Sequence, residues 1–194
     1  MAAPKSVDRP TLEQLDRELA RRKHSAAYQH AIRGTVWALV VVAAVAVICV
    51  NYFISALRVQ GDSMSPTLQD GEIIVAVRDG RFETGDLVAF YYGNKILIKR
   101  VIACPGQWVE IDEDGNVSVD SVLLDEPYLT EKSLGVTDLD YPFQVPDNQY
   151  FVMGDHRSVS VDSRCNVIGC VEKGAVIGRV AFRVWPFTWF NAFA

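Results

Sequence analysis

The sequence is poor in the residues on which several classes of small protein depend. It has 4 cysteines and 3 histidines among 194 residues, and its 24 acidic residues outnumber its 19 basic ones, for a formal net charge of -5. Four cysteines are too few for a fold built from disulfides, and the charge has the wrong sign for binding nucleic acid by bulk electrostatics. We therefore expect no nucleic-acid partner. The length allows one ordinary domain and an appendage.

Charge is absent from one long stretch near the N-terminus. Residues 35–57 contain no Asp, Glu, Lys or Arg, and a helix of that length reaches about 34 Å, enough for a hydrocarbon core of about 30 Å. A buried core helix and a cleaved signal peptide both usually have a shorter apolar segment, so we predict an uncleaved transmembrane signal anchor in the cell membrane. Residues 11–34 read as a polar helix, capped by Thr11 or an upstream residue.

Basic residues close to the anchor predict its orientation. They include Arg21, Arg22, Lys23 and Arg33, and positive charge beside a membrane span marks its cytoplasmic side. The chain is therefore divided into a cytoplasmic N-terminal segment (1–34), a single-pass transmembrane anchor (35–57) and an extracytoplasmic domain (58–194). The lipid bilayer is accordingly an expected partner.

The predicted outer domain reads as β-structure. Short β-branched or aromatic runs, bounded by Gly, Pro, Asp and Asn, predict strands; they are 72–77, 87–92, 96–102, 108–111, 117–122, 150–153 and 175–184. Asp114-Gly115 stands between two alternating segments and predicts a hairpin turn. Because no helices alternate with these runs, we predict a mainly β fold, with an antiparallel, barrel-like sheet preceded by one transmembrane helix.

The few candidate metal ligands do not form a convincing site. Cys165 and Cys170 are spaced C-x4-C, so a disulfide and two free thiols both remain open, but no second pair of ligands suggests zinc. The acidic run 112–116 would need glycine at position 117 to match a calcium loop, and Val117 stands there. We expect no metal and no cofactor.

Residues suited to nucleophilic chemistry lie in three segments. Ser63 belongs to a turn-like segment, GDSMSPTL, and Lys99 is embedded in the apolar strand ILIKRVI. Burial lowers the pKa of a lysine and can make its amine a base. His156, the one histidine in 58–194, is the base that a Ser-His-Asp triad would require. A loop histidine flanked by ions is the poorer candidate, so the pattern favours Ser63 and Lys99.

The segments GDSMSPTL, IKRVIACPG, LLDEPYL, VPDNQYFVMGD and GDHR with SVDSR follow one another after a single anchor. In this order they resemble bacterial type I signal peptidases, which are membrane-anchored Ser/Lys endopeptidases, and the single anchor is similar to the Gram-positive form. The resemblance implies the signal peptidase fold and cleavage of signal peptides from exported preproteins after an Ala-X-Ala type site. It also implies a location at the outer face of the cytoplasmic membrane, near the secretion translocon.

The resemblance also assigns roles to individual residues. Ser63 would be the nucleophile, with its backbone N–H holding the oxyanion, and Lys99 the general base. The implied supporting residues are Ser160, Asp155, Asp162 and Arg164. The implied substrate-binding residues are Met64, Leu68 and Ile98 for the first pocket, and Val59 and Ile74 for the third. The chain departs from the usual pattern at His156 and Ser158-Val159, and Gly61 replaces a serine that assists the oxyanion in some members.

Two other functions fit parts of the sequence. A non-catalytic, membrane-tethered assembly or binding module would have no need for both Ser63 and Lys99. A self-cleaving repressor of the SOS type shares the Ser/Lys chemistry but has no membrane anchor.

The aromatic segment 185–190 is expected either to lie at the bilayer interface or to close the core.

Overall fold

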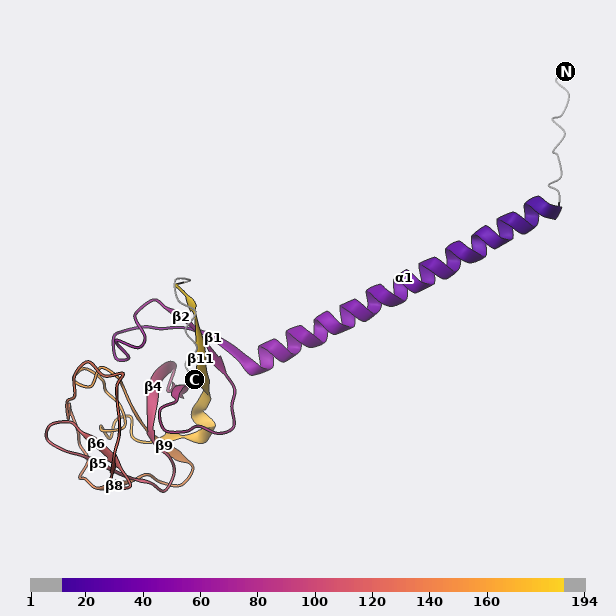
Figure 1. Ribbon diagram of the computed structural model, residues 1–194. Helices are drawn as coiled ribbons and strands as arrows, with labels where there is room; N and C mark the ends of the chain where they lie inside the picture. The colour runs from indigo at the N-terminus through magenta and orange to yellow at the C-terminus, as the bar shows by residue number, and fades with distance from the viewer. Residues whose placement is uncertain (1–11, 187–194) are drawn as a thin grey trace, which may run out of the picture. The chain divides into compact units, whose positions relative to one another are not determined.

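The computed structural model describes residues 12–186, which belong to two units, Met1–Val50 and Asn51–Ala194. Helix α1 (Leu12–Phe53) supplies the first unit (Figure 1). Its part Ile32–Phe53 has a mean hydropathy of 2.5 and is long and apolar enough to cross a membrane. The suggested cap Thr11 lies outside the described residues.

The apolar run 35–57 is divided between helix and strand. α1 ends at Phe53, and β1 (Ile54–Arg58) follows without a linker. β1 pairs antiparallel with β2 (Ile73–Val77) along its whole length, so its backbone groups are satisfied by the sheet rather than by another turn of helix. The last residues of the run are thus not helical, and the boundaries 1–34, 35–57 and 58–194 stay a prediction.

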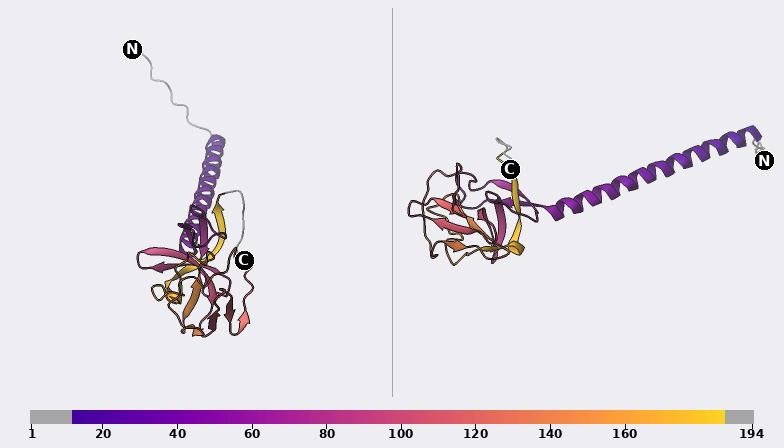
Figure 2. Two further views of the ribbon diagram at one scale, coloured as in Figure 1. Left: turned by 90° about the vertical axis from the view of Figure 1, so that its left-hand side faces the viewer. Right: turned by 60° about the horizontal axis from the view of Figure 1, so that its bottom comes forward.

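Two antiparallel sheets form the second unit (Figures 1 and 2). The larger has the order β1-β2-β11-β3-β4-β9-β10, and the smaller has the order β7-β6-β5-β8. The remaining strands of the larger sheet are β3 (Leu87–Tyr92), β4 (Lys95–Ala103), β9 (Gln149–Met153), β10 (Val171–Glu172) and β11 (Val176–Trp185). Those of the smaller are β5 (Trp108–Ile111), β6 (Val117–Val119), β7 (Val122–Leu123) and β8 (Phe143–Gln144). A 3-10 turn, Lys173–Ala175, precedes β11.

The mainly β, antiparallel fold is confirmed. Each predicted strand run coincides with a strand to within a few residues, except that 117–122 is split into β6 and β7. Asp120 and Ser121 cause the split because their φ angles of 50° and 65° form a turn. The hairpin at Asp114-Gly115 is also confirmed, since β5 and β6 pair across it.

Four apolar clusters fill the second unit. The largest joins β4 and β9 to β5 and β6, so it packs the two sheets together. Another lies under the segment between β1 and β2 and contains Val59, Met64, Leu68 and Ile74, with Ile98 packed against it. This second cluster matters for the site because it fixes the segment that carries Ser63.

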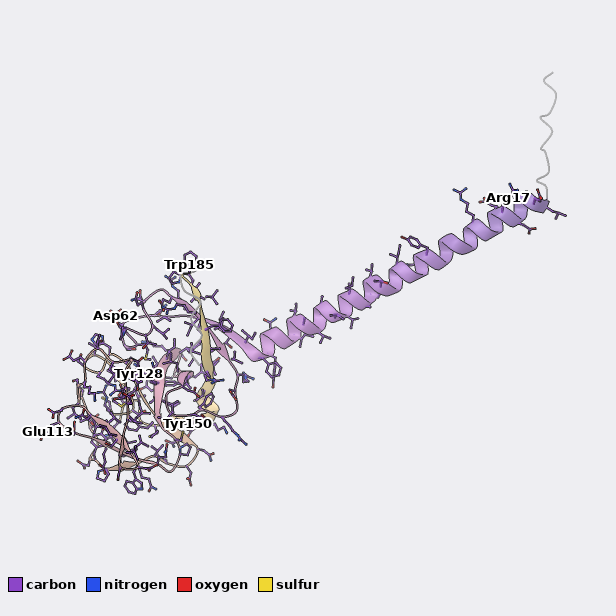
Figure 3. The ribbon with its side chains drawn as sticks, in the orientation of Figure 1. Arg17, Asp62, Glu113, Tyr128, Tyr150 and Trp185 are labelled. Atoms are coloured by element: carbon purple, nitrogen blue, oxygen red, sulfur yellow. The ribbon has the colours of Figure 1, made fainter. Side chains whose placement is uncertain are left out.

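One open question from the sequence has a structural answer, and a second falls mostly outside the described residues. Cys165 and Cys170 are free thiols, and the Cys165 thiol lies 3.2 Å from the Val136 carbonyl oxygen. At the end of β11, the Trp185 side chain is 55% exposed (Figure 3). The rest of the aromatic segment, 187–190, lies outside the described residues.

Candidate active site

Ser63 lies in a tight turn between β1 and β2. The Ser65 N–H donates to the Asp62 carbonyl at 3.0 Å, and the Leu68 N–H donates to the Met64 carbonyl at 2.9 Å. Met64 and Leu68 are buried in the cluster below, whereas Ser63 is half-buried. The apolar neighbours therefore hold the turn, while the serine stays accessible to a peptide.

The backbone of Ser63 has one occupied and one open polar group. Its carbonyl accepts a hydrogen bond from the His156 N–H at 3.1 Å. Within residues 12–186, neither its N–H nor its hydroxyl has a hydrogen-bond partner. An unoccupied N–H beside a nucleophile is what an oxyanion requires.

Lys99 is the buried lysine that the sequence predicted. It lies on β4 with 3% of its surface exposed, and its Nζ donates to the Ser160 hydroxyl at 2.8 Å. Burial lowers the pKa of Lys99 to about 8; the Asp162 carboxylate opposes this shift, the Arg164 guanidinium adds to it, and Asp155 opposes it. Lys99 is thus a strong enough base to act near neutral pH.

Gly154 is the point at which the serine turn and the lysine's partner meet. A Cβ added to Gly154 would lie 2.2 Å from Ser160 Oγ and 2.5 Å from the Ser63 carbonyl oxygen. Such distances are far below van der Waals contact, so only glycine allows this approach. The missing side chain brings Ser63, Ser160 and, through its hydrogen bond, Lys99 to one place.

Three buried ion pairs surround this place. Arg164 contacts both carboxylate oxygens of Asp162 at 2.8 Å each. Arg100 contacts Asp155 at 2.9 and 2.6 Å. The third pair joins Arg157 to Glu126. All three are two-point contacts between a planar guanidinium and a carboxylate, the geometry that best offsets the cost of burying charge.

The Asp162–Arg164 pair is connected directly to Gly154. The Gly154 N–H donates to Asp162 Oδ2 at 3.0 Å. Burial acts to raise the pKa of the Asp162 carboxyl, but Arg164, the Gly154 N–H and the Ser160 hydroxyl outweigh it and hold the pKa below its usual value. The carboxylate therefore stays charged beside Lys99, and Arg164 neutralises it.

The supporting residues are thus only partly one group. Asp162, Arg164 and Ser160 lie together, as predicted, whereas Asp155 pairs with Arg100 and also accepts a hydrogen bond from the Thr67 hydroxyl. Sequence reasoning missed Arg100, Thr67 and the Glu126–Arg157 pair. The sequence does contain a signal for Arg100. Neighbouring side chains on a strand lie on opposite faces, so Arg100 faces away from Lys99, and a buried arginine needs a carboxylate partner.

His156 does not occupy the position of a base. Its Nδ1 lies 3.3 Å from the Asp62 carbonyl oxygen, and no hydrogen bond joins its ring to the Ser63 hydroxyl within residues 12–186. The histidine contributes its backbone N–H to the serine turn. Lys99 makes no hydrogen bond to that hydroxyl within residues 12–186 either, but its amine is buried and is held by Ser160 beside Gly154, where the Ser63 carbonyl also lies.

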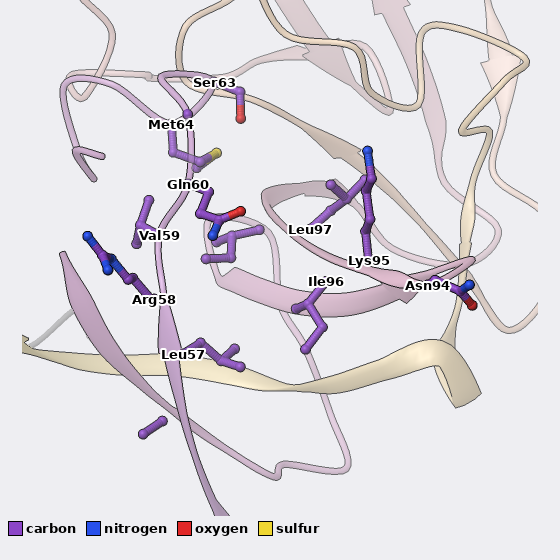
Figure 4. A pocket seen from close by; sticks show the side chains of 13 residues that line it. Leu57, Arg58, Val59, Gln60, Ser63, Met64, Asn94, Lys95, Ile96 and Leu97 are labelled. Carbon is purple, nitrogen blue, oxygen red and sulfur yellow. The ribbon is translucent and has the colours of Figure 1, made fainter. Parts of the chain in front are cut away.

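A groove of about 640 Å³ runs from Ser63 between the segment 56–61 and the first half of β4 (Figure 4). Three predicted substrate-binding residues, Val59, Met64 and Ile98, line it. Leu68 and Ile74 are fully buried in the cluster that supports this wall. β1 is an edge strand, and β4 pairs with β9 only from Arg100 onwards, so both walls offer unpaired backbone groups.

The described residues contain no group of three or more His, Cys, Asp or Glu side chains arranged to hold a metal ion. Their arrangement is suited instead to acid-base and nucleophilic chemistry. An accessible serine borders a groove with unpaired strand edges, and a buried lysine of lowered pKa follows on β4, whose first half forms the opposite wall.

Known proteins match this chain in sequence. The profile of the family described as "Signal peptidase, peptidase S26" matches residues 32–185. Signal peptidase IB of Staphylococcus aureus (strain COL) is 36% identical, over 73% of this chain and 83% of that protein. Signal peptidase I S of Bacillus subtilis (strain 168) is 37% identical, over 78% of this chain and 89% of that protein. A crystal structure of a signal peptidase I from Enterococcus faecalis V583 aligns with 28% identity and a TM-score of 0.43, over 52% of this chain and 97% of that chain.

Proposed function

The chain belongs to the signal peptidase family, peptidase S26, and we propose that Ser63 and Lys99 perform its chemistry. It is a membrane-anchored serine endopeptidase, a signal peptidase I, that cleaves signal peptides from exported preproteins. The observation that carries the proposed roles is the buried Lys99, with a pKa of about 8 and its Nζ held 2.8 Å from Ser160 Oγ.

The proposed reaction begins with neutral Lys99. Its amine takes the proton of the Ser63 hydroxyl as Ser63 Oγ attacks the carbonyl carbon of the scissile bond. The Ser63 N–H stabilises the oxyanion, and the Lys99 ammonium then gives its proton to the leaving amine. Water, deprotonated by Lys99, hydrolyses the resulting ester and releases Ser63. Ser160 orients the amine throughout.

The substrate is proposed to bind as an extended strand between the two walls of the groove. Unpaired backbone groups would provide its hydrogen bonds, and apolar pockets on one face would accept alternate side chains. Small residues at the first and third positions before the cut, as in an Ala-X-Ala site, fit shallow pockets at Met64, Ile98 and Val59. Leu68 and Ile74 would form the floor behind them.

The pH dependence of processing tests this proposal. With a purified full-length chain in detergent and one preprotein, we expect kcat/KM to rise with pH through an apparent pKa of about 8, because only the neutral amine can accept the Ser63 proton. Absence of trimmed product at every pH would refute the proposed function. A limb in the usual histidine range that disappears in His156→Ala would refute the lysine assignment.

Arg164 offers an internal check on the same profile. Arg164→Ala removes the positive charge that neutralises Asp162, and the uncompensated carboxylate should raise the pKa of Lys99, whereas Arg164→Lys keeps a charge there and should have a smaller effect. The rising limb should therefore shift to higher pH, with the larger loss of activity near pH 7. Breaking a buried pair costs about 3–5 kcal/mol, so thermal unfolding must accompany the measurement. An unchanged limb in folded Arg164→Ala would limit Arg164 to a structural role.

We also propose the orientation inferred from the basic residues, with the N-terminus in the cytoplasm and residues 58–194 outside the membrane. This is the side on which cleavage sites of preproteins arrive, and it would bring the domain near the secretion translocon. Protease added to intact protoplasts is expected to digest the domain and spare an N-terminal fragment that ends near the anchor. Protection of the domain with loss of the N-terminus would refute this orientation.

A further inference from the structure

The groove has a charge opposite to that of its domain. Residues 58–194 contain 12 basic and 20 acidic residues, yet the charged residues that line the groove are Arg58 and Lys95, with no acidic residue among the lining. Arg58 points away from Lys95 (Figure 4) and has a guanidinium nitrogen beside Gly71, 3.8 Å from where its Cβ would lie. Lys95 is therefore the charged residue of the groove that we examine as a contact for a bound peptide.

Lys95 has a well-defined place at the start of β4. It pairs with Tyr92 across the β3–β4 hairpin, and the Tyr92 hydroxyl donates to the Val167 carbonyl at 2.7 Å. The Lys95 side chain is exposed, and no ion pair joins its ammonium group to a carboxylate within residues 12–186. The backbone of Lys95 is thus fixed, while its ammonium group remains available to a bound chain.

Strand geometry places Lys95 relative to the reacting bond. Side chains alternate along β4, so Lys95 and Leu97 share a face with Lys99, while Ile96 and Ile98 share the other. Figure 4 shows Lys95 and Leu97 pointing away from Ile96. Lys95 precedes Lys99 by four residues, or about 13 Å along the strand.

The direction of the substrate follows from the sheet order. Each neighbouring pair in β1-β2-β11-β3-β4 is antiparallel, so β1 and β4 run in the same direction, and Ser63 and Lys99 lie towards their C-terminal ends. A peptide whose first residue before the cut lies beside Ile98 would place its third residue beside Ile96. Its second residue would then lie beside Leu97 and its fourth beside Lys95.

We propose that Lys95 is a specificity-determining residue, which favours Asp or Glu at the fourth position before the cleaved bond. The side chain at this position points away from the apolar pockets, on the face that carries the lysine. The inference rests on the proposed strand-like binding at Ser63 and Lys99. This preference for an acidic residue at the fourth position would act in addition to the requirement for small residues at the first and third positions.

The test compares preproteins that differ only at the fourth position. Purified full-length chain in detergent is given substrates with Asp, Asn or Lys there, and kcat/KM is measured for each. We expect Asp to exceed its isostere Asn by about two- to fivefold, the range of an exposed ion pair. The ratio should approach one in Lys95→Gln, fall below one in Lys95→Glu, and diminish in high salt.

Lys173→Glu is the matched control. Lys173 is exposed and outside the groove lining, so the same change in net charge there should leave the Asp-to-Asn ratio as in the unmodified chain. Equal ratios in Lys95→Glu and the unmodified chain would overturn the role of Lys95. A preference at another position would overturn the register. Cleavage of the Asn substrate separates these outcomes from failure of the proposed function, which would leave every substrate intact.

Discussion

Replacing Lys99 by alanine is expected to lower kcat/KM on a preprotein at pH 8 by about 10²- to 10⁴-fold, the usual contribution of a general base. Within residues 12–186, no other basic side chain makes the hydrogen bond to Ser160 that holds the Lys99 amine at 2.8 Å. Lys99→Arg should be as inactive, because a guanidinium remains protonated in any useful pH range. Circular dichroism must accompany both measurements, because each substitution changes a buried side chain and the loss of activity counts only in a folded variant.

Three further variants show whether Lys99 acts with Ser63 as its base. Ser63→Ala should be as inactive as Lys99→Ala, and the double variant should be little worse than either, because the two side chains act in one step. His156→Ala should retain most of its activity, since the one hydrogen bond of its ring within residues 12–186 is with the Asp62 carbonyl at 3.3 Å. An inactive His156→Ala beside an active Lys99→Ala would replace the lysine mechanism by a serine-histidine one.

Gly154→Ala is expected to cost about 10²-fold in kcat, the effect of displacing reacting groups by about 1 Å. The added Cβ would lie 2.2 Å from Ser160 Oγ and 2.5 Å from the Ser63 carbonyl oxygen. The backbone at Gly154 is held by the Asp162 carboxylate at 3.0 Å, so Ser160 and the serine turn must move. Activity should therefore fall although no side chain with acid-base chemistry has been removed.

Gly174→Ala is the control for this substitution. No atom lies within 4 Å of a Cβ added to Gly174, so alanine should leave activity unchanged. The unfolding midpoint of each variant separates displacement from unfolding. If Gly154→Ala stays folded and fully active, or loses activity only in proportion to its unfolded fraction, the proposed convergence at Gly154 is wrong.

Local patterns predicted most of the fold. β3 and β5 match their predicted runs, since alternating β-branched residues and turn dipeptides act over short distances. β1 was hidden because its residues 54–57 continue an apolar run, and only pairing with β2 shows that they are a strand. β8 and β10 have two residues each, too few for any period to appear.

The candidate site also has one part that local sequence predicts and one part that it does not. The local environment of Lys99, a lysine within an apolar strand, predicted its burial and lowered pKa. The pairing of Arg100 with Asp155 joins residues 55 positions apart, and no local rule selects that carboxylate among 24 acidic residues. The sequence could not predict that Gly154 must lack a side chain either. That need arises because the Ser63 carbonyl lies against Gly154, and the two residues are far apart in the sequence.

The unpaired edge of β4 has a consequence for how copies of the chain meet one another. An open strand edge is a template on which another protein can add a strand, which leads to association and aggregation. Here the open part lies within a groove, opposite the segment 56–61, and Lys95 marks its outer end. A recessed edge with a charge at its entrance accepts one extended chain but offers no flat surface to a second folded domain. The open edge of β4 is thereby less exposed to edge-to-edge assembly than the edge of an open sheet.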